Sequence, residues 1–282
     1  MEYALSFVLR LLKRAGDFFC IRSVMETLIL VFSAIFGLIF GSFLNVCIYR
    51  IPREKSIAWP PSACPKCNAH IRWYDNIPVF SFLWLRGKCR NCKQPISVQY
   101  PLVELLTGVL TFLFVWRYGL TPWTFVVLAA VYALVILSVI DLELMIIPDR
   151  FSLGLIGLGL AFAWLNPNFE GIWWQKELLS LLGAGVGLFG VLAIALIGTW
   201  WFKKEAMGGG DVKLMGGIGA LIGWEGVITT LIFASFLGLI YAIFLMIFKG
   251  KKGADAIPFG PFLSMGALIN LFYLVLPSML VI

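Results

Sequence analysis

The chain has 282 residues, of which 61% are hydrophobic and 13% are charged, and its mean hydropathy is +0.94. Soluble domains are nearer half apolar and a quarter charged, and a water-soluble fold of this length could not bury so much apolar surface. These figures exclude a soluble enzyme, a secreted disulfide scaffold and a disordered chain. They predict an all-α polytopic membrane protein.

Long apolar stretches alternate with polar ones along most of the chain. A helix that crosses about 30 Å of hydrocarbon needs about 20 apolar residues. Six stretches meet this need, and two more are short or rich in glycine. Counting both kinds predicts about eight transmembrane helices: Glu26–Val46, Leu102–Arg117, Trp123–Ile140, Phe151–Leu165, Leu178–Thr199, Leu214–Val227, Ile228–Phe248 and Phe262–Ile282.

The order of these stretches divides the chain into four parts. We predict an N-terminal amphipathic extension at residues 1–25, a first transmembrane helix at 26–48, a cytoplasmic loop at 49–100 and a transmembrane domain at 101–282. The extension has apolar residues at helical spacing with basic residues between them, which is typical of a helix lying in the membrane interface. It lacks the small-residue cleavage site of a signal peptide.

The net charge of +7 is concentrated between the apolar stretches, where nine of the 22 Lys and Arg lie between Arg50 and Lys93. With that loop in the cytoplasm, the inner loops of eight spans hold 16 Lys and Arg and the outer loops hold two. This distribution follows the positive-inside rule. The basic N-terminal tail is then placed outside, against the same rule. A nucleic-acid surface is the alternative reading of the basic loop; membrane orientation explains it better, so we expect no nucleic-acid partner.

Four cysteines in the basic loop form two CxxC pairs, Cys64/Cys67 and Cys89/Cys92. Two such pairs can complete a tetrahedral site for Zn²⁺, and four protein ligands make the site structural rather than catalytic. Disulfides are the alternative, but a cytoplasmic loop is reducing. His70 can substitute as a ligand, although four thiols suffice. The remaining two cysteines, at positions 20 and 47, are expected to be apolar fillers.

Two acidic residues stand where apolar spans meet loops. Asp141 follows an unbroken apolar run, and Asp211 closes a glycine run before a weak span. Acids at membrane depth are costly and usually functional. Two carboxylates from different helices can share a proton, so that one acts as a base toward water and the other as an acid. In the structural alternative, Asp141 ends its helix and Asp149 pairs with Arg150.

One glycine pattern imitates a cofactor motif. The stretch Gly185–Gly190 fits GxGxxG, but it lies inside an apolar span with no preceding strand. Small residues at this spacing let membrane helices pack closely, which is the interpretation we favour. The chain has no HExxH, GxSxG or Walker A motif.

Six features in order carry a resemblance to a known family. They are the two CxxC pairs and the stretches GSFLNVCIYRIP (Gly41–Pro52), ISVQYPLVELLTG (Ile96–Gly108), IDLELMIIPD (Ile140–Asp149), MGGGDVKLMGGIGA (Met207–Ala220) and IPFGPFLSMGAL (Ile257–Leu268). With them the sequence resembles the bacterial type IV prepilin peptidases, which are leader peptidase/N-methyltransferases and GxGD-type intramembrane aspartyl proteases.

The resemblance implies that Asp141 and Asp211 are the catalytic aspartates of a peptidase domain at 101–282. It implies removal of prepilin or pseudopilin leaders after a glycine, at the cytoplasmic face of the bacterial inner membrane. It also implies methylation of the new N-terminus by S-adenosylmethionine, for which no residue pattern locates the site. Glu104 is expected to contact the basic leader or the new amine, or to cap its helix.

Two other classes of protein share some of these features. A proton-coupled transporter would have glycine-rich helices and intramembrane acids, but its acids would be spread through the bilayer depth. A membrane-anchored zinc adaptor would bind protein or nucleic acid through the loop, and that loop would work when separated from the spans. The acids at one face favour the peptidase.

Overall fold

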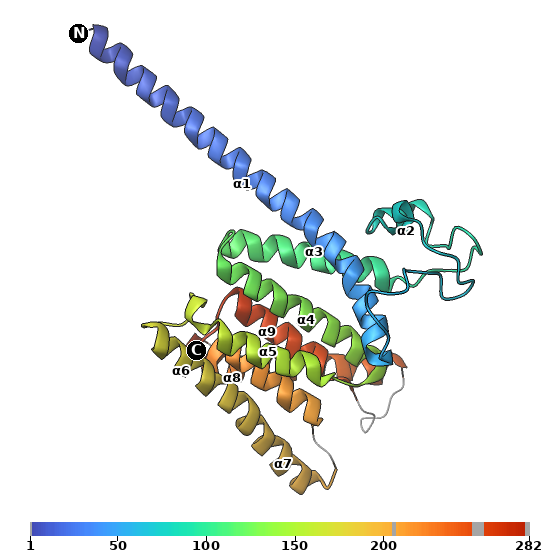
Figure 1. Ribbon diagram of the computed structural model, residues 1–282. Helices are drawn as coiled ribbons and strands as arrows, with labels where there is room; N and C mark the ends of the chain where they lie inside the picture. Colours follow the sequence, from blue (N-terminus) through green and yellow to red (C-terminus); the bar gives the residue numbers. More distant parts are fainter. Residues whose placement is uncertain (1, 205–206, 250–256, 280–282) are drawn as a thin grey trace.

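The computed structural model describes residues 2–204, 207–249 and 257–279, and within them the fold is all helical, without strands (Figure 1). Two isolated β-bridges lie in the loop after the first helix. The helices are α1 (Glu2–Arg50), α2 (Phe80–Trp84), α3 (Gln99–Tyr118), α4 (Pro122–Leu144), α5 (Asp149–Ala161), α6 (Trp173–Gly185), α7 (Val191–Phe202), α8 (Gly209–Lys249) and α9 (Gly260–Phe272), together with the short helical turns η1 (Ile51–Arg53), η2 (Trp73–Asn76), η3 (Ala163–Leu165), η4 (Val186–Gly190) and η5 (Pro277–Met279).

The expected multi-pass membrane architecture is confirmed, but the count of eight transmembrane helices is not. In the described residues, five helices are long and apolar enough to cross a bilayer: Val24–Arg53, Gln99–Tyr118, Pro122–Leu144, Trp173–Trp201 and Gly209–Phe248. The stretches expected as spans at 151–165 and 262–282 correspond to α5 and α9. Each of these helices has 13 residues and is about 20 Å long, which is shorter than the hydrocarbon core.

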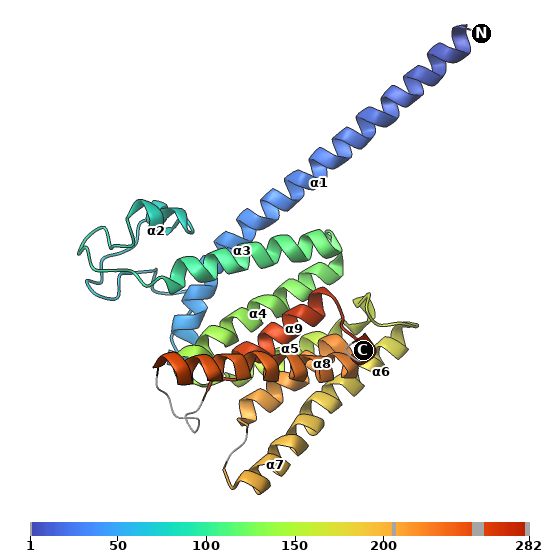
Figure 2. The same ribbon diagram turned by 180° about the vertical axis from the view of Figure 1, so that it is seen from behind.

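The two expected spans at 214–227 and 228–248 fall within α8, which is interrupted at Gly223. This residue has φ 78° and ψ 175°, a combination that is almost confined to glycine. A Cβ atom on Gly219 would lie 2.9 Å from Val227, although eight residues of straight helix span about 12 Å. The chain therefore turns back at Gly223, and Figure 2 shows the two halves running in different directions.

The first helix is continuous from residue 2 to residue 50, so the expected N-terminal extension is helical and joined to the first span. Its N-terminal half projects from the helical bundle in Figure 1. Its second half packs along α3 through small residues. A Cβ atom on Gly41 would lie 2.7 Å from the Cα of Glu104, and one on Gly108 would lie 2.8 Å from Leu38. Such close approach is how membrane helices associate when lipid removes the hydrophobic drive between them.

The GxGxxG stretch lies in a helix, as expected from its apolar context. It begins at the end of α6 and continues through the π-helical segment η4, which joins α6 and α7 into one membrane-spanning rod. Gly187 packs against α8, where its Cβ atom would lie 3.0 Å from the Cα of Gly216. The glycines therefore serve helix packing.

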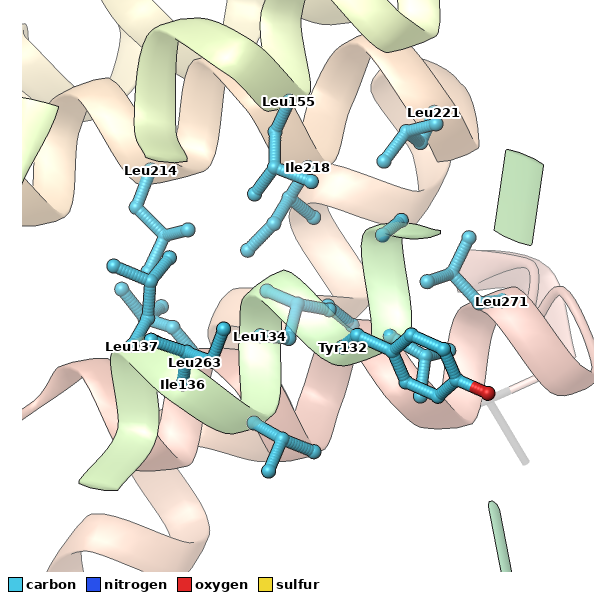
Figure 3. Close-up of a cluster of buried hydrophobic side chains, with 14 of the residues drawn as sticks. Tyr132, Leu134, Ile136, Leu137, Leu155, Leu214, Ile218, Leu221, Leu263 and Leu271 are labelled. Atoms are coloured by element: carbon cyan, nitrogen blue, oxygen red, sulfur yellow. The ribbon is translucent and has the colours of Figure 1, made fainter. Parts of the chain in front are cut away.

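The core of the bundle surrounds α4. About two thirds of the membrane-spanning part of this helix is buried. Figure 3 shows how leucine and isoleucine side chains from four helices meet there. They come from α4, α5, the first half of α8 and α9, and include Leu134, Leu137, Leu155, Leu214, Ile218, Leu221, Leu263 and Leu271. This packing brings the C-terminal end of α4 beside the N-terminal ends of α8 and α9.

The break in α8 leads to a stability prediction. Gly223→Ala should destabilise the protein by about 1–3 kcal/mol, because alanine is strained at this backbone conformation and its Cβ atom would lie 3.2 Å from the Phe169 ring. Gly157→Ala is the control: a Cβ atom at this position in α5 meets nothing within 4 Å, so the change should be neutral or stabilising by roughly 0.5–1 kcal/mol. Thermal unfolding in detergent, followed by circular dichroism, measures both. Equal melting temperatures for the two variants would contradict this account.

Candidate active site

The two acids singled out in the sequence lie on different helices at the same end of the bundle. Asp141 is in the last turn of α4 and is 5% exposed. Asp211 is in the first turn of α8. The two side chains are close enough to interact electrostatically. The fold thus brings together two carboxylates that are 70 positions apart in the chain.

Asp141 is held by the beginning of α9. The backbone N–H of Gly260 donates to Asp141 Oδ2 over 2.9 Å, and this bond is buried. A Cβ atom at position 260 would lie 2.8 Å from the same oxygen, so the contact requires glycine. Gly260 is the first residue of α9, and the positive end of a helix dipole favours a neighbouring carboxylate.

Asp211 has a different environment. A backbone hydrogen bond from Gly208 reaches its carboxylate, and among the described residues nothing bonds to its buried Oδ1 atom. Ile147 contacts a glycine near each acid: its side chain would meet Cβ atoms placed on Gly210, at 2.9 Å, and on Gly260, at 3.2 Å. The glycines on both sides therefore leave the carboxylates close together with one free acceptor oxygen.

Asp149 forms an ion pair, but not with the residue expected from the sequence. Its carboxylate does not pair with Arg150; both oxygens accept hydrogen bonds from Nζ of Lys213 at 2.8 Å. Lys213 follows Asp211 by two residues, so the ion pair joins the start of α5 to the start of α8. Both side chains are about half exposed. Exposed ion pairs of this kind contribute little to stability.

The four loop cysteines converge on one point. Their Sγ atoms all lie within 4.8 Å of one another, and Cys64 and Cys92 are 3.9 Å apart. Tetrahedral Zn²⁺ with Zn–S bonds of roughly 2.3 Å needs sulfurs about 3.8 Å apart. The cluster could therefore hold a metal ion. His70, the alternative ligand, is exposed and does not belong to it.

The two cysteine pairs have the same local structure. An antiparallel bridge closes each one, from Ala63 to His70 and from Lys88 to Pro95. In each pair the first cysteine's carbonyl accepts from the residue after the second cysteine, which is left-handed: Asn68 in one pair and Lys93 in the other. Each pair is therefore a knuckle that turns both of its sulfurs to one side.

The surroundings of the sulfurs favour thiolates at two positions. A hydrogen bond from the backbone of Ala69, with a second from the Asn91 amide, lowers the pKa of Cys67 to about 6. Backbone hydrogen bonds from Cys92 and Asn91 lower the pKa of Cys89. At Cys92 a backbone hydrogen bond from Gln94 favours the thiolate, but burial and hydrogen bonds with Cys67, Cys89 and Cys64 raise its pKa to about 11. Because thiolates are the form that binds metal, Cys67 and Cys89 are the two sulfurs best prepared to bind a cation.

Glu104 joins the cysteine loop to the bundle. It lies in the second turn of α3, is 8% exposed, and its Oε2 accepts the backbone N–H of Val79 at 2.7 Å. Ser42 on α1 also bonds to this carboxylate. Val79 has φ 60°, which is an outlier for a β-branched residue, so the contact holds the loop in a strained turn. The expected cap of α3 is not observed; Glu104 binds a distant turn instead.

Three contacts at these sites were missed in the sequence: Gly260 with Asp141, Lys213 with Asp149, and Glu104 with Val79. Each joins residues that are far apart in the chain. Gly260 lies in one of the stretches that carried the family resemblance, but nothing in that stretch indicates a backbone donor for an acid 119 positions away.

Together, the fold and this site define a multi-pass membrane protein with paired carboxylates at one end of its helical bundle and a four-cysteine loop outside it. Residues 128–243 match the type IV leader peptidase family, and residues 35–118 match the bacterial peptidase A24 N-terminal domain. The chain belongs to the type IV leader peptidase family. A comparison with solved structures found no match.

The chain is similar to several curated proteins with the name prepilin leader peptidase/N-methyltransferase. The protein from Myxococcus xanthus is 40% identical over 79% of this chain and 65% of its own length. The Pectobacterium carotovorum protein is 37% identical over 84% of this chain and 90% of its own length. The Neisseria gonorrhoeae protein is 35% identical, with 88% and 91% covered.

The contact of Glu104 with Val79 predicts how the loop is anchored. Glu104→Ala leaves the partly buried N–H of Val79 without its acceptor, at a cost of about 1 kcal/mol, so limited proteolysis should cut residues 50–99 faster than in the unchanged protein. Glu104→Gln keeps an acceptor oxygen and should restore most of the protection. Equal cleavage rates for all three proteins would show that this contact does not hold the loop.

Proposed function

We propose that this protein is a membrane endopeptidase that removes the leader of type IV prepilins or pseudopilins after a glycine, and that it then methylates the new N-terminus. The observation that carries the proposal is the pairing of two carboxylates from α4 and α8 at one end of a membrane bundle. The shared name of the relatives supports both activities. The proposed location is the bacterial inner membrane, with the carboxylates at the cytoplasmic side.

In this proposal Asp141 and Asp211 perform acid–base proteolysis without a covalent intermediate. One carboxylate takes a proton from a water molecule while that water adds to the scissile carbonyl carbon. The other donates a proton to the leaving nitrogen, so that the C–N bond breaks and a free amine forms. Gly260 orients Asp141, and the free Oδ1 of Asp211 is an acceptor for the water. Glycines beside both acids leave room for an extended substrate backbone.

The proposed cofactors have separate roles. A structural Zn²⁺ would be held by Cys64, Cys67, Cys89 and Cys92 and would keep the two knuckles together. S-adenosylmethionine, when bound, supplies the methyl group for the amine that cleavage creates. The lipid bilayer and the apolar prepilin segment are the proposed partners of the bundle. The division of the chain at residues 25, 48 and 100 stays a prediction.

The carboxylate pair gives the first test of this function. Asp141→Asn and Asp211→Asn should each abolish leader cleavage, because general acid and general base steps each contribute about 10²–10⁴-fold. Asp149→Asn is the matched control: it removes an exposed carboxylate from the same region, and it should cost less than about tenfold. Mass spectrometry of a purified prepilin after incubation measures the product. Substantial turnover by either dyad variant would refute the assignment.

The cysteine cluster predicts one zinc per chain by elemental analysis. Replacing Cys64 and Cys67 with Ser should remove it, since two ligands cannot hold a structural ion. Because metal binding and loop folding are linked, chelation should also make residues 50–99 sensitive to protease. A metal-free protein whose loop is equally protected would count against a structural metal.

The two activities should be separable. Cleavage needs water and two carboxylates, whereas methyl transfer needs a donor pocket and a neutral amine. Asp141→Asn and Asp211→Asn should therefore still methylate a pre-cleaved pilin, while loss of Cys64 or Cys67 should impair both reactions. Incorporation of label from S-adenosylmethionine into mature pilin is the measurement. If folded, substrate-bound aspartate variants transfer no label, the two reactions share these residues.

A further inference from the structure

The short helix α2 presents an apolar face that no described part of the chain covers. Phe80, Leu83 and Trp84 lie at positions i, i+3 and i+4, so they share one side of the helix. They are 58%, 67% and 72% exposed, and the rings of Phe80 and Trp84 stack with their centres 6.0 Å apart. We call these three side chains the α2 face. A solvated loop would gain nothing from displaying them together.

The opposite side of α2 is fixed. The Ser81 hydroxyl donates to the carbonyl of Tyr74 at 2.9 Å and accepts from the backbone of Ile77 at 3.1 Å. Phe82 packs against Gly87, where a Cβ atom would lie 3.1 Å from its ring. The α2 face therefore points outward because the loop structure holds it there, and it cannot turn inward without breaking these bonds.

The anchoring of the loop places α2 at the edge of the bilayer. Val79, which precedes α2, donates to Glu104 in the second turn of the membrane-spanning helix α3. Glu104 is five residues into α3, or roughly 8 Å along its axis. The start of α2 thus lies at the depth where a span enters the headgroup region. Figures 1 and 2 both show α2 beside the N-terminal end of α3 and outside the bundle.

The charge around α2 completes an interfacial pattern. The segment from Arg50 to Lys93 holds nine Lys and Arg against two acids, and one of those acids, Asp75, is paired with Arg90 at 2.6 Å. Arg86 and Lys88 follow α2 directly and are exposed. Aromatic residues settle at the membrane interface, and basic residues beside them are attracted to anionic headgroups.

We propose that the α2 face inserts into the headgroup and upper acyl region of an anionic leaflet, and that Arg86 and Lys88 bind its headgroups. The occupant of the face is the lipid surface, rather than a second copy of the chain, because two copies would bring the same strongly basic segments together. The anchor would hold the cysteine knuckles at the membrane surface. It does not depend on the proposed enzymatic function.

Quenching by bromine reports insertion directly. The full-length protein is reconstituted in nanodiscs whose lipids carry bromine high in the acyl chains, and the emission of Trp84 is taken as the difference between the protein and its Trp84→Phe variant. Trp200→Phe, at a 77% exposed position in a span, gives the quenched reference, and Trp123→Phe, at a 3% exposed position, gives the unquenched one. We expect the emission of Trp84 to be quenched as strongly as that of Trp200. A Trp84 signal unaffected by bromine would overturn the proposal.

Hydrogen exchange of the unchanged protein tests the headgroup contacts without a substitution. Peptides covering residues 79–93 should be protected severalfold more in discs containing phosphatidylglycerol than in phosphatidylcholine alone, and salt should reduce the difference. Arg86→Gln with Lys88→Gln should abolish the difference while leaving Trp84 quenched. Equal protection in both lipids would overturn the headgroup contacts. Protection that appears only with two copies per disc, or only with added prepilin, would identify a protein as the occupant and overturn the lipid anchor.

Discussion

The hydrogen bond from Gly260 to Asp141 is the contact on which the arrangement of this end of the bundle depends. A carboxylate that is 5% exposed at the edge of a bilayer needs a donor, and in this fold the donor is the backbone at the start of α9. The bond, 2.9 Å from the Gly260 nitrogen to Asp141 Oδ2, requires the start of α9 to lie beside the last turn of α4. Glycine at position 260 and the side chain of Ile147 then determine how much space is left beside the acid.

The same need for close approach explains why glycine is frequent in the helices around α8. In lipid, helices associate through van der Waals contact, so small residues at the interfaces allow the backbones themselves to touch. Gly187 and Gly216 bring η4 against α8, and Gly217 makes room for Leu155 of α5. The first half of α8, which carries Asp211, is thereby clamped between neighbours on two sides. A rigid support of this kind suits a carboxylate that must keep its position relative to another helix.

The sequence allowed the class of protein, the long spans and the convergence of the cysteines to be predicted, because each depends on local composition or spacing. It also indicated helices where α5 and α9 lie, but it did not show that each has only 13 residues. Hydropathy counts apolar residues, and it cannot distinguish a span from a 13-residue helix that is buried by its neighbours, as α9 is. The turn in α8 was expected between the spans 214–227 and 228–248, but its position was not: the apolar run continues through Gly223, and only the backbone conformation shows that the reversal is there.

The candidate site, too, has features that could be predicted from the sequence and features that could not. The positions of Asp141 and Asp211 at span ends could be read from the chain, since Asp141 follows an apolar run and Asp211 precedes one. Their partners could not. Lys213 and Arg150 are both positively charged, and whether Asp149 pairs with one or the other depends on how α5 and α8 approach each other. A contact between a side chain and a backbone group, such as that of Glu104 with Val79, leaves no signal in residue types at all.

The cysteine loop and the carboxylates are connected by rigid structure rather than by a flexible tether. Glu104 fixes the loop to α3. About two helical turns further along α3, the hydroxyl of Thr111 bonds to that of Tyr132 on α4 at 2.9 Å. The ring of Tyr132 also stacks on Phe40 of α1, with centres 4.9 Å apart. Since Asp141 lies in the last turn of α4, three packed helices set the position of the loop relative to the acids. An amine released at the carboxylates would therefore always emerge at the same place relative to the loop, which is the arrangement that two consecutive reactions on one chain end require.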